Sequence, residues 1–107
     1  GANSVTVGEV LKSATEMGYR SLGFDGGRIE EGSLADMILI SLKHPSMVPL
    51  NDAPSNVVFS CFGDAVRYTI VDGNILMDDG KVEGEDLIVE RAGKYAIDLM
   101  EGCQCMI

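Results

Sequence analysis

The sequence has little of what catalysis, nucleic-acid binding or membrane insertion usually requires. Its 107 residues include one histidine and no tryptophan, and eight basic residues face seventeen acidic ones, for a net charge of −9. An acidic surface repels phosphate groups and anionic lipids, so we expect no nucleic-acid partner and no membrane partner. The longest apolar run, Met37–Ile40, is far shorter than the ~20 residues of a membrane-spanning helix. The length also excludes a complete (β/α)₈ barrel, which takes roughly 250 residues.

The cysteines are few and odd in number. Cys61 stands alone, and Cys103 and Cys105 lie one residue apart. This is not the even-numbered framework of a small secreted protein, and no basic-then-apolar signal opens the sequence, so we expect a reducing, cytoplasmic setting. The 46% hydrophobic content argues against a disordered acidic tail and favours a folded domain.

The first element has a clear start signal. Thr6 followed by Glu9 is a capping box, and apolar residues at helical spacing predict a helix over Val7–Met17. Gly18 is placed to end that helix in a left-handed conformation, and one further turn should stop at Gly23.

Strands are expected in the middle of the chain. Ala35–Leu42 is apolar on both alternating faces, which predicts a strand buried on two sides, whereas Arg28–Glu30 is at most a short strand. His44–Ser55 carries all three prolines and is interpreted as an ordered loop or a polyproline-like crossing. Asn56–Phe62 fits either a short helix or a strand.

A three-stranded meander is the strongest sheet signal. Val66–Val71 is β-prone, and Asp72-Gly73 is a preferred pair for a two-residue type I′ turn into Asn74–Met77. A second turn at Asp78–Gly80 leads to a brief strand at Lys81-Val82.

The last element predicted is a helix over 85–101, with acidic residues at its start. Its apolar positions form a stripe that we expect to be buried: Leu87, Ile88, Ala92, Tyr95, Ala96 and Leu99. The fold class predicted is mainly β with flanking helices, in a single domain over 1–107. Its parts are a helix and short turn at 5–23, strands at 28–83, the helix at 85–101 and a frayed tail at 102–107.

The residues alone offer no catalytic constellation. His44 is interpreted as a hydrogen-bonded structural or surface histidine, and Cys61 as a small core residue. Cys103 and Cys105 lack the second pair of a zinc site, so an unstructured tail with two thiols is favoured over a cysteine-held metal. We therefore assign no catalytic, cofactor-binding or metal-binding residue.

The motifs taken together resemble the C-terminal segment of amidohydrolase-superfamily enzymes. Ala14–Gly23 resembles the segment that closes their barrel, and Ile29–Ile40 resembles the "G-x-I-x-x-G-x-x-A-D" entry into their small β-sandwich. Ser55-Asn56 with Val66–Asn74 resembles the later "S-N…V-x-x-x-x-V-x-G" stretch. The similarity covers about Val5–Glu101 and is nearest to the chlorohydrolase and cytosine-deaminase-like branch.

This resemblance implies a parent enzyme with Zn²⁺ or Fe²⁺ in a (β/α)₈ barrel, where the metal activates a water molecule for hydrolysis. Family ligands are an early His-x-His pair, two later histidines and a late aspartate, and none of these positions matches this chain. His44, Cys61 and Asp36 are therefore not assigned as ligands, and we expect the chain to be inactive and without a cofactor of its own.

The resemblance also implies an incomplete composite β-sandwich, because several of its strands come from the N-terminus of the parent. The uncovered sheet face and edges predict a homo-oligomer in the absence of the barrel. The alternative function is a stand-alone interaction or oligomerisation module that retains the sandwich fold.

Overall fold

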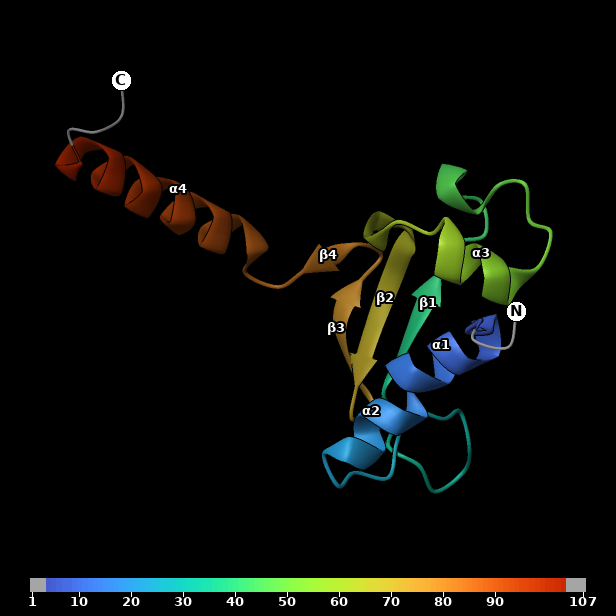
Figure 1. The fold of residues 1–107 in the computed structure, drawn as a ribbon. Helices are drawn as coiled ribbons and strands as arrows, with labels where there is room; N and C mark the ends of the chain where they lie inside the picture. Colours follow the sequence, from blue (N-terminus) through green and yellow to red (C-terminus); the bar gives the residue numbers. More distant parts are fainter. Residues whose placement is uncertain (1–3, 104–107) are drawn as a thin grey trace.

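A computed structural model describes residues 4–103, which form a four-stranded sheet, helices α1, α2 and α3 grouped beside it, and a helix α4 that extends away (Figure 1). The elements in chain order are α1 (Val7–Ala14), α2 (Glu16–Ser21), β1 (Met37–Ile40), the 3₁₀ helix η1 (Pro45–Met47), α3 (Ala53–Phe59), the 3₁₀ helix η2 (Gly63–Ala65), β2 (Val66–Val71), β3 (Asn74–Asp78), β4 (Lys81–Val82) and α4 (Glu85–Gly102). Among these described elements, helices hold more residues than strands, so the expectation of a mainly β chain is corrected to a mixed α and β fold.

Helix α1 begins as predicted and ends early. The Glu9 amide donates to Thr6 Oγ1 (3.2 Å) and the Thr6 amide donates to Glu9 Oε2 (3.0 Å), which confirms the capping box. The backbone leaves helical geometry at Thr15 (φ −122°, ψ −96°), so the predicted helix is split into α1 and α2. Gly18 lies inside α2 and does not end a helix, whereas Gly23 adopts the expected left-handed conformation (φ 80°) after α2.

The sheet is an antiparallel meander of order β1-β2-β3-β4. Asp72 (φ 50°) and Gly73 (φ 76°) are both left-handed, as a type I′ turn between β2 and β3 requires. The predicted strands and turns of this hairpin are therefore confirmed. The early strand β1 joins along the other side of β2, with Met37 opposite Ile70.

The proline-containing segment is more regular than a loop. It includes η1 and the start of α3, whose first turn accepts Pro54 because amides there need no helical partner. Asp52 caps α3 by accepting from the Ser55 amide (3.1 Å). Residues 56–59 are helical, which settles the alternative left open for Asn56–Phe62.

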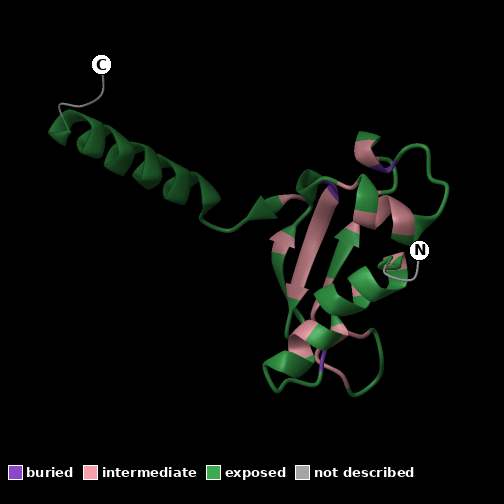
Figure 2. Cartoon of the chain, in the orientation of Figure 1, coloured by how far each residue is buried: buried purple, intermediate pink, exposed green. Residues whose placement is uncertain are grey.

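Few side chains of this chain are buried (Figure 2). Met47 and Ala65 are the buried hydrophobic residues among those described. Strand β1 was expected to be covered on both faces, yet Ile38 and its neighbour Leu39, which face opposite sides of the sheet, are 54% and 47% exposed. The prediction of two-sided burial is wrong for this chain, because nothing within residues 4–103 covers either side fully.

Helix α4 extends away from the sheet (Figure 1), and its residues are exposed along its whole length (Figure 2). Its position was predicted, but the expected burial of its apolar stripe is wrong for the chain as described. Gly102 is still helical, so the tail expected at 102–107 begins later, and residues 104–107 lie outside the described residues.

The chain is extended for its size. Its radius of gyration is 18.8 Å, against about 13 Å for a compact domain of this length. Its accessible surface is 8658 Å², against roughly 5,800 Å² for a folded monomer of this mass. The difference is surface, polar and apolar together, that a self-contained domain of this mass would bury. No helix within residues 4–103 is long and apolar enough to cross a membrane.

Candidate functional site

Two adjoining grooves separate the helix pair α1–α2 from the sheet. They have volumes of about 410 and 610 Å³, and both are open to solvent. Their shared lining consists of Ala14, Thr15, Tyr19, Asp36 and Val71. The walls are mainly apolar, and Asp36 is the one carboxylate that both grooves share.

Asp36 joins three parts of the fold. Its Oδ2 accepts a hydrogen bond from the Tyr19 hydroxyl on α2, and its Oδ1 accepts from the Asp72 amide (2.7 Å) in the β2–β3 turn. The Gly73 amide also donates to the Ala35 carbonyl (3.0 Å) beside it. We call Tyr19, Asp36 and the Asp72 amide the Asp36 junction, and it ties the end of the helix pair to one end of the sheet.

The junction changes the acidity of its members. The hydrogen bond from Tyr19, followed by the one from the Asp72 amide, lowers the pKa of Asp36 below its ordinary value of 3.8. The same carboxylate raises the pKa of Tyr19 above 10.0, chiefly through the hydrogen bond. Asp36 is therefore an ionised, fully engaged acceptor at neutral pH, which suits a structural joint better than proton transfer.

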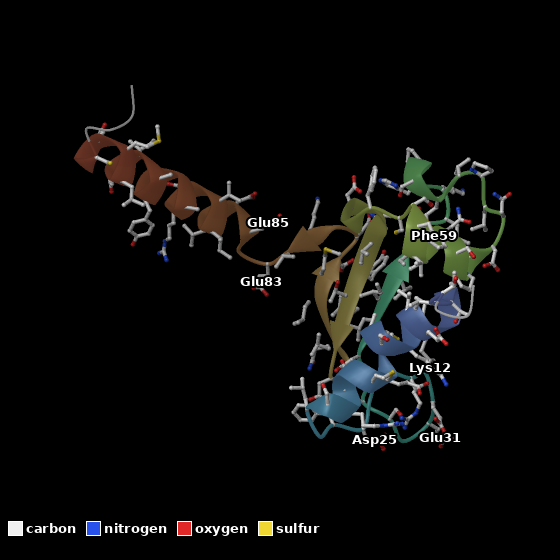
Figure 3. The ribbon with its side chains drawn as sticks, in the orientation of Figure 1. Lys12, Asp25, Glu31, Phe59, Glu83 and Glu85 are labelled. Carbon is white, nitrogen blue, oxygen red and sulfur yellow. The ribbon has the colours of Figure 1, made fainter. Side chains whose placement is uncertain are left out.

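The turn at Gly27 and Arg28 lines the smaller, 410 Å³ groove. Gly27 (φ 79°) passes so close to the α1–α2 break that a Cβ there would lie 2.5 Å from the Thr15 carbonyl carbon. Arg28 follows and bridges Asp25 (2.5 Å) and Glu30 (2.9 Å), with a further hydrogen bond to Ser33 (3.1 Å). Asp25 lies at the bottom of the molecule in Figure 3, next to α2. These contacts are exposed ion pairs of a loop, and they hold its shape.

His44 is placed at the start of η1. Its Nδ1 accepts from the Ser46 amide (3.1 Å), and its Nε2 lies 3.3 Å from Asp64 Oδ2. Cys61 is half-buried near the end of α3, and its thiol donates to the neighbouring Phe62 carbonyl (3.4 Å). These residues take part in local contacts, and the structure brings neither of them to the grooves.

The described residues do not fit a metal centre. Within residues 4–103, no three His, Cys, Asp or Glu side chains are grouped so that they could hold a metal ion. Cys103 lies at the end of α4, far along the chain from His44 and Cys61, and Cys105 lies outside the described residues. Sequence reasoning missed the Asp36 junction, although the "A-D" pair at the end of the second motif was a signal for it.

Comparison with protein families agrees with this fold. The model of the amidohydrolase family matches residues 1–76, which is most of the chain. The chain belongs to the amidohydrolase family.

Relatives of the chain in sequence include deaminases of adenosine derivatives. It is 41% identical over 102 residues to a 5-methylthioadenosine/S-adenosylhomocysteine deaminase of Haloarcula marismortui, covering 94% of this chain and 24% of that protein. It is 44% identical over 92 residues to a 5'-deoxyadenosine deaminase of Methanospirillum hungatei, covering 86% of this chain and 20% of that protein. The chain therefore spans less than a quarter of the length of these relatives.

Solved structures give the same picture of the fold. An adenosine deaminase from Xanthomonas campestris with bound zinc superposes with a TM-score of 0.82 at 22% identity, over 91% of this chain and 23% of that one. The zinc complex of the atrazine chlorohydrolase TrzN from Arthrobacter aurescens gives a TM-score of 0.72 at 26% identity, over 85% of this chain and 20% of that one. Both neighbours are zinc-bound, which supports a metal in the family as a whole.

Proposed function

We propose that this chain is the C-terminal, non-catalytic portion of a metal-dependent amidohydrolase that deaminates adenine-containing nucleosides. One observation carries the proposal. Nearly the whole chain matches deaminase relatives, but the match covers less than a quarter of the length of each of those proteins. Its role is to brace the catalytic body of the parent enzyme. The residues described here do not fit a metal site, so in the parent the metal would be held by residues outside this chain.

The uncovered surface of this chain supports the proposal that a catalytic body covers it in the parent enzyme. A free-standing domain of this mass would expose roughly 2,900 Å² less than this chain does. The exposed residues include neighbours on β1 and β3 that face opposite sides of the sheet, such as Ile75 (59%) and Leu76 (54%). A composite sandwich accounts for this exposure, because strands supplied by the rest of the parent would cover one face and extend the open edge of β1.

The choice of deaminase over chlorohydrolase rests on sequence identity. The sequence relatives named above are deaminases at 41% and 44% identity, whereas the chlorohydrolase structure is 26% identical. The Asp36 junction fits the bracing role, since it fixes the helix pair against the sheet. A cytoplasmic location belongs to the same proposal and rests on the odd number of cysteines.

The test uses the full-length parent and two substrates. We expect the parent to release ammonia from 5'-deoxyadenosine and no chloride from a chlorotriazine. Chloride release without ammonia would assign the chlorohydrolase branch instead. If the gene contains no longer reading frame around these residues, the chain is a stand-alone interaction module and the proposal is wrong.

A further inference from the structure

Helix α4 carries an apolar stripe that no part of the described chain covers. At 100° per residue its members fall within an arc of about 140°, and we call them the α4 stripe: Ile88, Val89, Ala92, Tyr95, Ala96, Leu99 and Met100. After the first turn, the charged residues lie on the opposite side: Glu90, Arg91, Lys94, Asp98 and Glu101. Leu99 (74%) and Tyr95 (69%) are among the most exposed large hydrophobic residues of the described chain.

Little within residues 4–103 holds α4 in place. The connection from β4 is two residues long, Glu83 and Gly84, and Figure 3 labels Glu83 within it and Glu85 at the start of the helix. Gly84 takes a left-handed conformation (φ 77°) before the helix. The hydrogen bond found across this connection joins the Val82 amide to Glu85 Oε2 at 3.5 Å, at the limit of such a bond. A helix with an apolar stripe this exposed and with so little support requires a partner surface.

Helix α4 has a counterpart in much longer chains. Residues 1–84 make up less than four fifths of the sequence, yet the superposition on the zinc-bound adenosine deaminase covers 91% of it and so extends into α4. The match to the Haloarcula deaminase, over 94% of this chain, extends into α4 as well. The family model stops at residue 76 and assigns no role to this helix.

The area of the α4 stripe favours a partner within the same chain. Burying an aliphatic side chain removes on the order of 100 Å² from water, so the five large members offer about 500 Å². A stable interface between separate molecules needs roughly 800 Å² from each partner. A tethered helix needs less, because its high effective concentration removes most of the entropic cost of association.

We propose that the α4 stripe docks on the part of the parent chain that lies outside residues 1–107. This inference rests on the proposed function, since it requires that the longer chain exists. The receiving surface is an apolar groove with basic residues along its rim, because α4 carries five acidic and two basic side chains. Docking anchors the end of the bracing segment on the catalytic body, at a point distant from the Asp36 junction.

The experiment measures amide hydrogen exchange of α4 in the full-length parent, with Leu99→Asp on the stripe and Ile97→Asp as the matched control. Ile97 is 55% exposed on the charged side of the same helix. We expect α4 to be protected in the parent and to exchange at least tenfold faster in Leu99→Asp. Ile97→Asp should leave the protection unchanged, and so should dilution of the parent.

The other outcomes overturn the proposal. Protection that disappears on dilution would show that a second copy covers the stripe, and absence of protection would show that nothing does. Equal effects of the two substitutions would indicate a general loss of helix stability. The exchange readout does not depend on turnover, so a parent that releases no ammonia would refute the proposed function and leave the docking result standing.

Discussion

Asp36 has the most informative surroundings of any single residue in this chain. Both of its oxygens are hydrogen-bond acceptors, for groups separated by 17 and 36 positions in sequence. Because its pKa is lowered, the stabilisation it gives is fully present above its ordinary value of 3.8 and is lost as the pH falls through the lower folded value. Because the pKa of Tyr19 is raised, the stabilisation from that group is present below 10.0 and is lost as the pH rises through its higher folded value.

Replacement of the carboxylate tests this junction directly. Asp36→Asn removes the charge that favours the protonated hydroxyl, so the pKa of Tyr19 should return toward 10.0. Ultraviolet titration of the three tyrosines measures the effect. Asp72→Asn is the matched control, because only the backbone amide of Asp72 contributes to the junction, and it should leave the titration curve unchanged. An unchanged curve for Asp36→Asn would contradict the assignment.

At the scale of the elements, the break between α1 and α2 depends on a glycine distant in sequence. Gly27 has a left-handed backbone and no space for a side chain beside Thr15. The helix break at Thr15 and the turn at Gly27 are therefore packed against each other. Together they form part of the wall of the groove beside the Asp36 junction.

Gly27→Ala should be strongly destabilising, by about 3 kcal/mol, because backbone strain of about 1–2 kcal/mol adds to overpacking against the helix backbone. Gly32→Ala is the matched control. Gly32 has a similar backbone (φ 90°) with nothing within 4 Å of an added Cβ, so only the strain of about 1–2 kcal/mol applies. Urea unfolding measures the loss of unfolding free energy in each variant. Equal losses in the two variants would show that close packing at Gly27 adds nothing to the backbone strain.

Sequence predicted those elements whose signals are local. The Thr6 capping box and the Asp72-Gly73 turn each encode their geometry within a few residues, and both were found where expected. The break at Thr15 was missed because it is packed against Gly27, twelve positions away. The predicted burial of β1 and of the α4 stripe was wrong for a different reason. Apolar periodicity shows that a face needs to be covered, but it does not show whether the covering element belongs to the same stretch of chain.

The Asp36 junction could be predicted only in part. The motif ending at Asp36 marked the position, but its partners are a hydroxyl on α2 and a backbone amide in the β2–β3 turn. No sequence pattern connects these three points before the sheet and the helix pair are assembled. Local signals were therefore sufficient for the hairpin and insufficient for the contacts that join it to the helices.

At the scale of the whole molecule, the chain combines a large apolar surface with a high net negative charge. The apolar surface favours association, and the charge of −9 opposes it through mutual repulsion. Both effects are expected if, as proposed above, the neighbours of this segment lie elsewhere in a longer parent.

Residues 1–107 expressed alone should self-associate, and more so when salt screens the repulsion or the pH approaches the isoelectric point near 4.3. Size-exclusion chromatography with light scattering measures the mass across concentration and salt. The full-length parent serves as the control and should show no such salt dependence. A clean monomer of the isolated chain at high concentration would show that its exposed surface needs no cover.

As proposed above, these residues support a catalytic body and perform no hydrolysis themselves. The decisive measurement is ammonia release from 5'-deoxyadenosine by residues 1–107, purified alone and supplied with zinc. We expect no release above the buffer rate, alongside ready release by the full-length parent at the same concentration. Turnover by the isolated chain would show that the catalytic residues lie within it.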